Sequence, residues 1–261
     1  MILKNAKIMD DTFTLVDACL STEGERIADI APDLHGEEEI DLAGCVVVPG
    51  FVDIHIHACV GADTCDASTA GLAKMAAHLV TKGVTSFCPT TMTVSHEEIE
   101  DALATVKACM DDRPFGAAIM GVNMEGPYIS INKKGAQKGE YVKNPNWEEF
   151  KGFYDGCGGI IKLVDIAPEC EGADEFIKKA SKLCTVSIAH TDADYDQAKH
   201  AFNIGITHAT HLYNAMSGMT HRSPGVVGAV FDDERVRAEI ICDGFHINPA
   251  VLRVTFRQLG E

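Results

Sequence analysis

Pro49-Gly50-Phe51-Val52-Asp53-Ile54-His55-Ile56-His57 is the stretch that decides how this 261-residue chain is interpreted. It has the pattern of a short apolar strand that is entered through a Pro-Gly turn. Successive side chains of a strand point to opposite faces, so His55 and His57 share one face and the two isoleucines pack behind them. Two imidazoles on one face of a strand can bind one metal ion. This interpretation requires further ligands from later parts of the chain.

The composition indicates a globular protein with a sizeable core, since 46% of the residues are hydrophobic. The net charge of −17 argues against a nucleic-acid-binding protein, which needs a basic face. No run approaches the roughly 20 apolar residues that span a bilayer, so no membrane partner is expected. Residues 1–7 lack the apolar run of a signal peptide and have the pattern of an edge strand. We therefore expect a cytoplasmic protein whose ten cysteines are reduced.

The chain divides into two parts by its pattern. Residues 1–48 predict a small β-domain, because short β-rich runs alternate there with turn residues, at 2–9, 14–20, 26–30 and 41–48. In residues 49–261, strands alternate with helices, which indicates a parallel sheet. The predicted strands are 51–57, 84–88, 117–124, 159–166, 185–189, 206–210 and 237–242. The predicted helices are 68–82, 96–110, 173–183, 194–203 (capped by Thr191 or Asp192) and 249–259.

The predicted fold class is α/β, with a (β/α)8 TIM-type barrel that has about seven of its eight strands and follows the small N-terminal β-domain. Polar residues follow nearly every predicted strand. A barrel collects its active site from the C-terminal ends of many strands, whereas an open sheet places its site at one switch point. The distribution of polar residues therefore favours the barrel. Its eighth strand is expected to lie beyond residue 261.

Three further candidate ligands stand at predicted strand ends. Glu125 ends the third strand, His190 the fifth and His211 the sixth. Imidazole and carboxylate are the ligands of Zn²⁺ or Fe²⁺ in hydrolytic sites. His208 lies three residues before His211 and cannot share a regular strand face with it, so we leave His208 as a packing or outer residue. With His55 and His57, five candidate ligands lie on four strand ends.

These residues belong to a longer set of motifs, and through them the chain resembles the N-acetylglucosamine-6-phosphate deacetylases of the amidohydrolase superfamily. The run His211-Leu212-Tyr213-Asn214-Ala215-Met216, followed by 222–225, is specific to that family, whereas the His-x-His element marks only the superfamily. The resemblance covers essentially all 261 residues. The matching segments are 49–57, 61–64, 83–85, 125–128, 133–136, 167–169, 189–191, 210–216, 222–225 and 243–246.

The resemblance implies a role for each candidate ligand. It implies that Glu125, His190 and His211 bind the principal divalent metal, with zinc or iron expected. His55 and His57 would hold a second ion, with Glu125 bridging the two. Because some relatives lack the His pair and use one metal, the number of ions stays open at one or two.

The resemblance also implies a substrate and a partner. An amino-sugar phosphate would lie in a pocket lined by Ala136, Asn214, Ala215 and His246. Arg222 would reach the phosphate bound in the neighbouring subunit, which implies a homodimer. A planar, permanently charged guanidinium suits a phosphate, so the chemistry of Arg222 agrees with this role.

The implied reaction is hydrolysis of the acetamide of N-acetylglucosamine 6-phosphate to glucosamine 6-phosphate and acetate, in amino-sugar catabolism. The family's general base is an aspartate at the end of strand eight, which is expected beyond Glu261. We therefore assign no catalytic acid–base residue and expect a C-terminally truncated deacetylase. Loss of a general base costs about 10²–10⁴-fold in rate, so weak or absent turnover is expected.

Two other interpretations remain. The first is a different amidohydrolase, of the dihydroorotase or allantoinase type, which uses a carboxylated lysine after strand four as its bridging ligand. Lys162 is the candidate for that lysine, although Glu125 already supplies a bridging carboxylate. The second is a non-catalytic module that binds a metal or a sugar phosphate.

Overall fold

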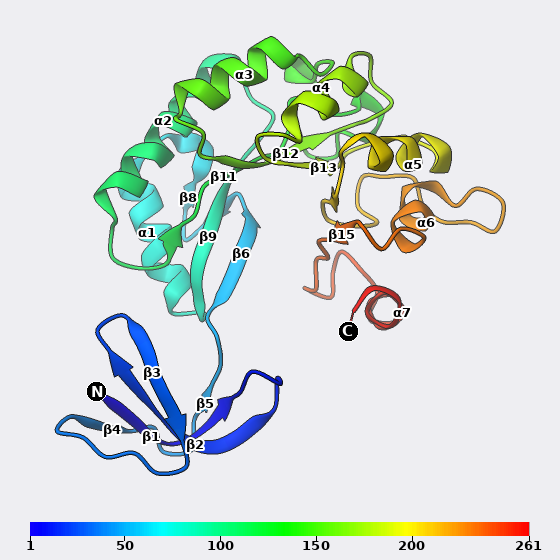
Figure 1. The fold of residues 1–261 in the computed structure, drawn as a ribbon. Helices are drawn as coiled ribbons and strands as arrows, with labels where there is room; N and C mark the ends of the chain where they lie inside the picture. Colours follow the sequence, from blue (N-terminus) through cyan, green and yellow to red (C-terminus); the bar gives the residue numbers. More distant parts are fainter. Residues whose placement is uncertain (261) are drawn as a thin grey trace. The chain divides into compact units, whose positions relative to one another are not determined.

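The chain folds into two compact units, Met1–Phe51 and Val52–Glu261, each of which we describe by itself. The structure is a computed structural model that describes residues 1–260 (Figure 1). Each unit buries an apolar cluster of its own. This is the behaviour of segments that each hold enough apolar residues to build a core.

The N-terminal unit is a small β-sheet. Its strands are β1 (Ile2–Met9), β2 (Leu15–Glu23), β3 (Arg26–Ala31), β4 (Glu39–Asp41) and β5 (Val46–Val47). They lie in the order β3-β2-β1-β4, and β5 also pairs with β1. The buried cluster comprises Ala6 and Ile8 on β1 with Ala18 and Leu20 on β2, at alternate positions of each strand. The single strand predicted over 41–48 is wrong, because positive φ angles at Ala43 and Gly44 turn the chain between β4 and β5.

The second unit is built on a curved, mainly parallel sheet. Its strands lie in the order β6-β9-β11-β12-β13-β14-β15, with β10 paired to β9, and the pairs from β9 to β15 are parallel. A separate hairpin joins β7 and β8. The bounds are β6 (Phe51–Ile56), β7 (Ala58–Cys59), β8 (Ala62–Asp63), β9 (Val84–Thr91), β10 (Ala118–Ile119), β11 (Val122–Met124), β12 (Ile161–Ile166), β13 (Thr185–Ile188), β14 (His208–Ala209) and β15 (Arg237–Ala238).

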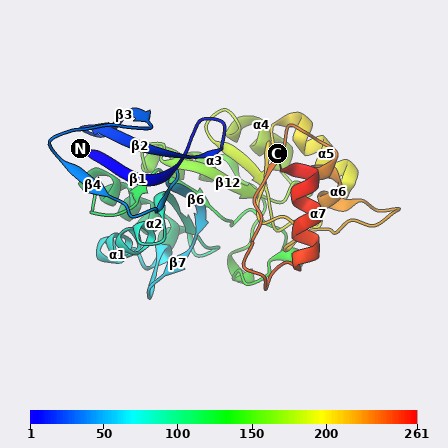
Figure 2. The ribbon, with the colours of Figure 1, turned by 90° about the horizontal axis from the view of Figure 1, so that it is seen from below.

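Helices α1 to α5 follow the outer side of this curved sheet (Figure 1). Consecutive helices from α1 to α6 contact one another. In both ribbon views α7 lies beside α6, where Gln258 Nε2 donates to Phe231 O at 3.4 Å (Figure 2). Within residues 1–260, no helix has the length and apolar character that a membrane span requires. The helices are α1 (Thr69–Val80), α2 (His96–Asp112), α3 (Trp147–Gly156), α4 (Ala173–Ala180), α5 (Tyr195–Ile204), α6 (Gly225–Phe231) and α7 (Pro249–Leu259), with short 3-10 turns η1 (Thr64–Asp66), η2 (Ile131–Lys133) and η3 (Gly139–Tyr141).

The alternation of strands and outer helices confirms the predicted incomplete (β/α)8 barrel with its small N-terminal β-sheet. The sheet fills seven strand positions, since β10 and β11 are two pieces of the strand predicted over 117–124. The break falls at Gly121, whose φ is +147°. A Cβ there would lie 2.5 Å from Ile160 O, so the close approach of β12 requires glycine at this point.

Other boundaries differ from the predictions for local reasons. The cap of α5 is Asp194, not Thr191 or Asp192: Asp194 Oδ1 accepts from Gln197 N at 2.8 Å, and the Gln197 side chain accepts from Asp194 N at 2.9 Å. This reciprocal capping box fixes the start of the helix. The strands predicted over 206–210 and 237–242 shorten to β14 and β15. Helices α3 and α6 were not predicted.

Candidate metal centre

Glu125 lies at the centre of the site and is the group that all the predicted ligands share. It follows β11 directly and is 2% exposed. Gly126 comes next with φ +77°, where a Cβ would lie 2.0 Å from Thr93 Oγ1, so only glycine fits behind the carboxylate. Four imidazole Nε2 atoms surround the carboxylate: those of His211 at 3.0 Å, His190 at 3.1 Å and His55 at 3.5 Å from Oε1, and that of His57 at 3.1 Å from Oε2.

The first group of potential metal ligands comprises Glu125, His190 and His211, all buried. His190 follows β13 and His211 follows β14, two neighbouring strands of the sheet. Both have left-handed backbones, with φ of 42° and 34°. Such angles are costly for residues other than glycine and recur at functional sites, where the surrounding structure holds them. The two Nε2 atoms are 3.1 Å apart.

The second group comprises Glu125, His55 and His57. His55 belongs to β6 and His57 follows it directly, and the period of the strand brings both rings to the same side as predicted. Their Nε2 atoms are 3.3 Å apart, and the rings meet edge to face with centroids 5.1 Å apart. The two groups of potential ligands therefore share one carboxylate, and the ring centroids of His55 and His211 are 5.7 Å apart.

The other ring nitrogens show which tautomer these histidines adopt. His190 Nδ1 donates to Lys133 O at 2.9 Å, and His57 Nδ1 donates to Thr90 O at 3.2 Å. His55 Nδ1 donates to Glu239 Oε2 at 2.8 Å. In a neutral imidazole the proton then sits on Nδ1, so Nε2 presents a lone pair to the Glu125 carboxylate. Lone pairs that face a carboxylate are suited to a cation between them, and outer partners on Nδ1 are typical of metal-binding histidines.

The electrostatics of the site agree with a cation. Burial raises the pKa of Glu125, but the neighbouring rings of His190, His211 and His57 outweigh it and hold that pKa well below its usual range. Burial lowers the pKa of His55, whereas Glu239 and Glu125 raise it to about 9. Burial also lowers the pKa of His190, but Glu125 and the carbonyl of Lys133 outweigh it and raise that pKa. A field that favours positive charge on these rings also favours a divalent ion, which takes the place of protons on its ligands.

Gln137 is a residue of the site that the sequence did not reveal. It is 3% exposed, and its Nε2 donates to Glu125 Oε2. Its Oε1 accepts from Thr93 N at 2.7 Å, which fixes the orientation of the amide. No spacing rule marks a glutamine in a loop. Glu239 was also missed, although it directly follows β15 and the strand-end rule that found Glu125 could have found it.

A buried polar chain lies on the strands that carry the site. Thr210 Oγ1 contacts Asp165 Oδ1 at 2.7 Å and Ser187 Oγ at 2.7 Å, and Ser187 Oγ contacts His208 Nδ1 at 2.9 Å. Burial and the charge of Glu125 raise the pKa of Asp165 to about 8, and burial lowers the pKa of His208. His208 thus occupies a buried hydrogen-bonded position and is absent from both groups of potential ligands.

The predicted substrate-binding residues lie on three loops. Asn214 and Ala215 follow His211; Asn214 Nδ2 donates to His211 O at 3.3 Å, and Ala215 O accepts from Thr191 N at 3.0 Å. Ala136 is exposed and directly precedes Gln137. The remaining two, Arg222 and His246, are exposed on loops farther along the chain. The structure brings together the five predicted metal ligands but shows no contact that joins Arg222 or His246 to them within residues 1–260.

Lys162, the candidate for a carboxylated lysine, lies near the start of β12 and is exposed. It lines a surface hollow with Ser181, Lys182 and Thr207. Glu125 instead follows the C-terminal end of β11. A carboxylate on Lys162 is therefore at the opposite end of its strand from the bridging position that the rival amidohydrolase interpretation requires.

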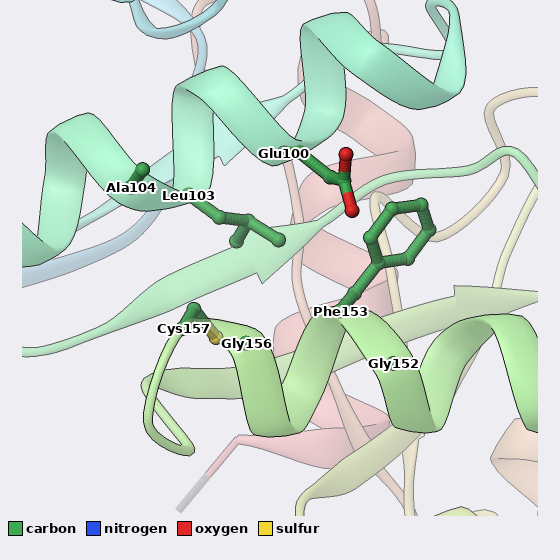
Figure 3. A pocket seen from close by; sticks show the side chains of 7 residues that line it. All are labelled: Glu100, Leu103, Ala104, Gly152, Phe153, Gly156 and Cys157. Atoms are coloured by element: carbon green, nitrogen blue, oxygen red, sulfur yellow. The ribbon is translucent and has the colours of Figure 1, made fainter.

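A groove of about 190 Å³ lies between α2 and α3, away from the residues of the centre. Figure 3 shows Phe153 and Glu100 on its two sides. None of its lining residues is a predicted ligand or substrate contact: Glu100, Leu103, Ala104, Gly152, Phe153, Gly156 and Cys157. The functional argument therefore does not use this groove.

Comparisons with known proteins agree with this geometry. The profile of the Amidohydrolase family matches residues 46–258. N-acetylglucosamine-6-phosphate deacetylase of Bacillus subtilis is 35% identical over 100% of this chain and 68% of its own length, and the Homo sapiens deacetylase is 34% identical over 90% of this chain and 58% of its own length. The chain spans 57% to 68% of the length of such curated relatives.

Solved structures give the same result. The N-acetyl-D-glucosamine-6-phosphate deacetylase of Mycobacterium smegmatis superimposes with a TM-score of 0.89 at 29% identity, over 100% of this chain and 68% of that protein. A mutant of the same enzyme in complex with N-acetyl-D-glucosamine-6-phosphate gives the same values. By its sequence and its fold, this chain belongs to the amidohydrolase family, among the N-acetylglucosamine-6-phosphate deacetylases.

Proposed function

We propose that this chain carries the metal centre of an enzyme that hydrolyses the acetamide of N-acetylglucosamine 6-phosphate to glucosamine 6-phosphate and acetate. The observation that carries the proposal is the convergence of four imidazole Nε2 atoms on the buried Glu125 carboxylate. Membership in the deacetylase family supports the choice of substrate. The solved complex of the M. smegmatis relative with N-acetyl-D-glucosamine-6-phosphate supports it further.

The nitrogen and oxygen donors of the centre fit one or two divalent ions, of which zinc and iron suit this set best. Glu125, His190 and His211 would hold the principal ion, and His55 and His57 a second. Such an ion polarises a carbonyl oxygen and makes water a better nucleophile near neutral pH. Gln137 and the Nδ1 partners of the histidines keep the ligand atoms pointed at the Glu125 carboxylate.

The protein groups around this centre suggest how the substrate is held. Asn214 and the backbone near Ala215 directly follow His211 and offer hydrogen-bond donors to sugar or acetyl oxygens. Ala136 directly precedes Gln137, whose side chain contacts Glu125. We propose that His246 and the Arg222 guanidinium bind the phosphate, with Arg222 serving the site of a neighbouring subunit in a homodimer. The expected cytoplasmic location stays a prediction.

Asp243 is not the general base in this proposal. Its Oδ1 accepts from Phe245 N at 2.8 Å and from His246 N at 3.0 Å, and its Oδ2 accepts from His246 Nδ1 at 2.7 Å. These contacts lower the pKa of Asp243 to about 2. A carboxylate of this acidity is a weak proton acceptor at neutral pH, so we assign Asp243 to the shape of the loop that carries His246.

The test is metal analysis of the purified protein combined with an acetate-release assay on N-acetylglucosamine 6-phosphate. We expect at least one bound zinc or iron per chain, and weak acetate release that N-acetylglucosamine without phosphate does not support. His190→Asn is the matched loss-of-ligand variant, and Asp174→Asn, which changes a carboxylate between α4 and α5, is the control. Bound metal and sugar phosphate without acetate release would instead support a non-catalytic binding module.

A further inference from the structure

The strand order of the sheet separates β6, which carries His55, from β15, which Glu239 follows. β6 pairs with β9 at one end of the order, and β15 ends the other side. His55 and Glu239 are 184 positions apart in sequence and come from these two end strands, yet His55 Nδ1 lies 2.8 Å from Glu239 Oε2. The contact is partly buried, with side-chain exposures of 16% and 13%. A side-chain hydrogen bond thus links two end strands that share no backbone pairing within residues 1–260.

The backbone of Glu239 is tied to the half of the centre that contains His211. Glu239 N donates to Ala209 O at 2.9 Å, and Leu212 N donates to Glu239 O at 2.9 Å. These two bonds flank His211 in sequence. The position of the Glu239 carboxylate is therefore set by β14 and its loop, whereas the ring that it holds belongs to β6. Replacing the side chain leaves both backbone bonds intact.

His55 is the hydrogen-bond partner of this carboxylate within residues 1–260. Glu239 Oε1 is buried and makes no hydrogen bond there, and His208 Nε2 lies 3.8 Å from it, beyond hydrogen-bond distance. With its proton on Nδ1 directed to Glu239, His55 presents its Nε2 lone pair toward Glu125 and His57. Without this acceptor, the ring is free to turn or to carry its proton on Nε2, where it blocks a metal.

We propose that Glu239 is a positioning residue for His55, and that a cation binds between His55, His57 and Glu125 with full affinity only while Glu239 holds the ring. The proposal rests on the metal centre of the proposed function and assigns Glu239 to one of its two halves. Binding by Glu125, His190 and His211 does not involve this contact. Outer partners of ligating histidines typically change metal affinity by about 10–100-fold, which sets the expected size of the effect.

The experiment is a Zn²⁺ titration of the chelator-treated protein in competition with a chromophoric chelator. We expect wild type to bind two ions. Glu239→Ala should weaken one of them by about 10–100-fold and leave the other within about twofold. Glu239→Gln, whose amide oxygen can still accept from His55 Nδ1, should fall between. The control Asp174→Asn removes the charge from a carboxylate that contacts the His200 ring at the surface, and should leave both affinities unchanged.

A second readout does not depend on metal. Imidazole ¹⁵N–¹H correlation spectra of the metal-free protein should show a hydrogen-bonded proton on His55 Nδ1 in wild type and in Glu239→Gln, and should lack that signal in Glu239→Ala. Two unchanged affinities in Glu239→Ala, equal weakening of both ions, or a wild type that binds a single ion would each overturn the proposal. A selective loss of one ion without acetate release in wild type would uphold it and contradict the proposed deacetylation instead.

Discussion

The two pairs of histidines around Glu125 are supported in different ways. The side chains of His190 and His211 are 8% and 9% exposed, and they follow adjacent strands within the parallel sheet. The side chains of His55 and His57 are 16% and 28% exposed and come from β6, an end strand that pairs with β9. The buried pair thus lies within the sheet, whereas the edge pair depends on a side-chain acceptor, because His55 Nδ1 donates to Glu239. Glu125 is therefore shared by two halves of the centre. We call His190 and His211 the rigid half, and His55 and His57 the conditional half.

The largest effect should come from the residue that both halves share. Glu125→Gln replaces the charged bridging group with a neutral amide of the same shape. We expect the affinity for every ion to fall by more than about 100-fold, beyond the range of an outer partner. The measurement is metal content after dialysis against a buffered zinc concentration. Retention of one ion at wild-type affinity would show that one half is complete without the shared carboxylate.

The next test separates the two halves directly. His190→Asn and His55→Asn each remove one imidazole, and each should reduce the zinc content by one ion per chain. We expect His190→Asn to weaken the binding of its ion by more than about tenfold. The variant should also lower the melting temperature, because the partly buried Lys133 O loses the hydrogen bond from the ring. His55→Asn should leave the melting temperature almost unchanged. Identical stability losses in the two variants would contradict the contrast between a rigid and a conditional half.

Gln137 tests whether the bridging carboxylate needs its amide neighbour. Gln137→Leu removes the donor to Glu125 and leaves the amide of Thr93 buried without an acceptor. We expect the free energy of unfolding to fall by about 1–3 kcal/mol. Urea denaturation measures this loss. The control is Gln258→Leu, an exposed glutamine on α7 that should change the unfolding free energy by less than about 0.5 kcal/mol. Similar losses in both variants would contradict the buried role.

The smallest effect concerns the support behind the rigid half. Glu149 on α3 accepts from Tyr128 Oη at 2.9 Å, Lys143 Nζ at 2.6 Å and His96 Nδ1 at 3.0 Å, and Tyr128 is buried in the loop after Glu125. Burial raises the pKa of Glu149, but these hydrogen bonds outweigh it and lower the pKa below its usual value. A carboxyl group with a lowered pKa in the folded state stabilises the fold above its unfolded-state pKa, and this contribution is lost as the pH falls through the folded-state pKa.

Glu149→Gln should therefore cost about 1–2 kcal/mol of unfolding free energy at pH 7, and the difference from wild type should shrink as the pH falls below about 4. Urea denaturation across this pH range measures it. The neighbouring, exposed Glu148→Gln is the control and should show no such convergence. A difference between wild type and Glu149→Gln that stays constant with pH would contradict a role for the charge.

The sequence predicted the barrel and the five side chains that converge on one point because both depend on strong local rules. Strand alternation brings His55 and His57 to one side, and strand ends place Glu125, His190 and His211 along one edge of a parallel sheet. The shortening of β14 and β15 and the break at Gly121 were not predictable, because they arise from backbone turns that side-chain pattern does not encode. Gln137 became visible only through its contacts with Thr93 and Glu125, whereas Glu239 directly follows a strand and the strand-end rule could have found it.

The sequence was less informative about the predicted substrate contacts. Asn214 and Ala215 are tied to the centre by the loop that carries His211, so a motif close to a ligand was informative about position. Arg222 and His246 are exposed, and their roles depend on a sugar phosphate and a second subunit that a single chain does not place. The roles of Arg222 and His246 are therefore assigned from the family resemblance.

The hydrogen bond between His55 and Glu239 has a consequence for the mechanics of the barrel. It connects the first and last strands of the sheet order at the level of the metal centre, so an ion held by His55 draws β6 toward the strands that carry Glu125 and His211. The affinity for that ion and the free energy of forming the contact between His55 and Glu239 are then thermodynamically linked. Removing the cation should therefore weaken the contact between His55 and Glu239, and any change that strengthens this contact should raise the affinity for the cation.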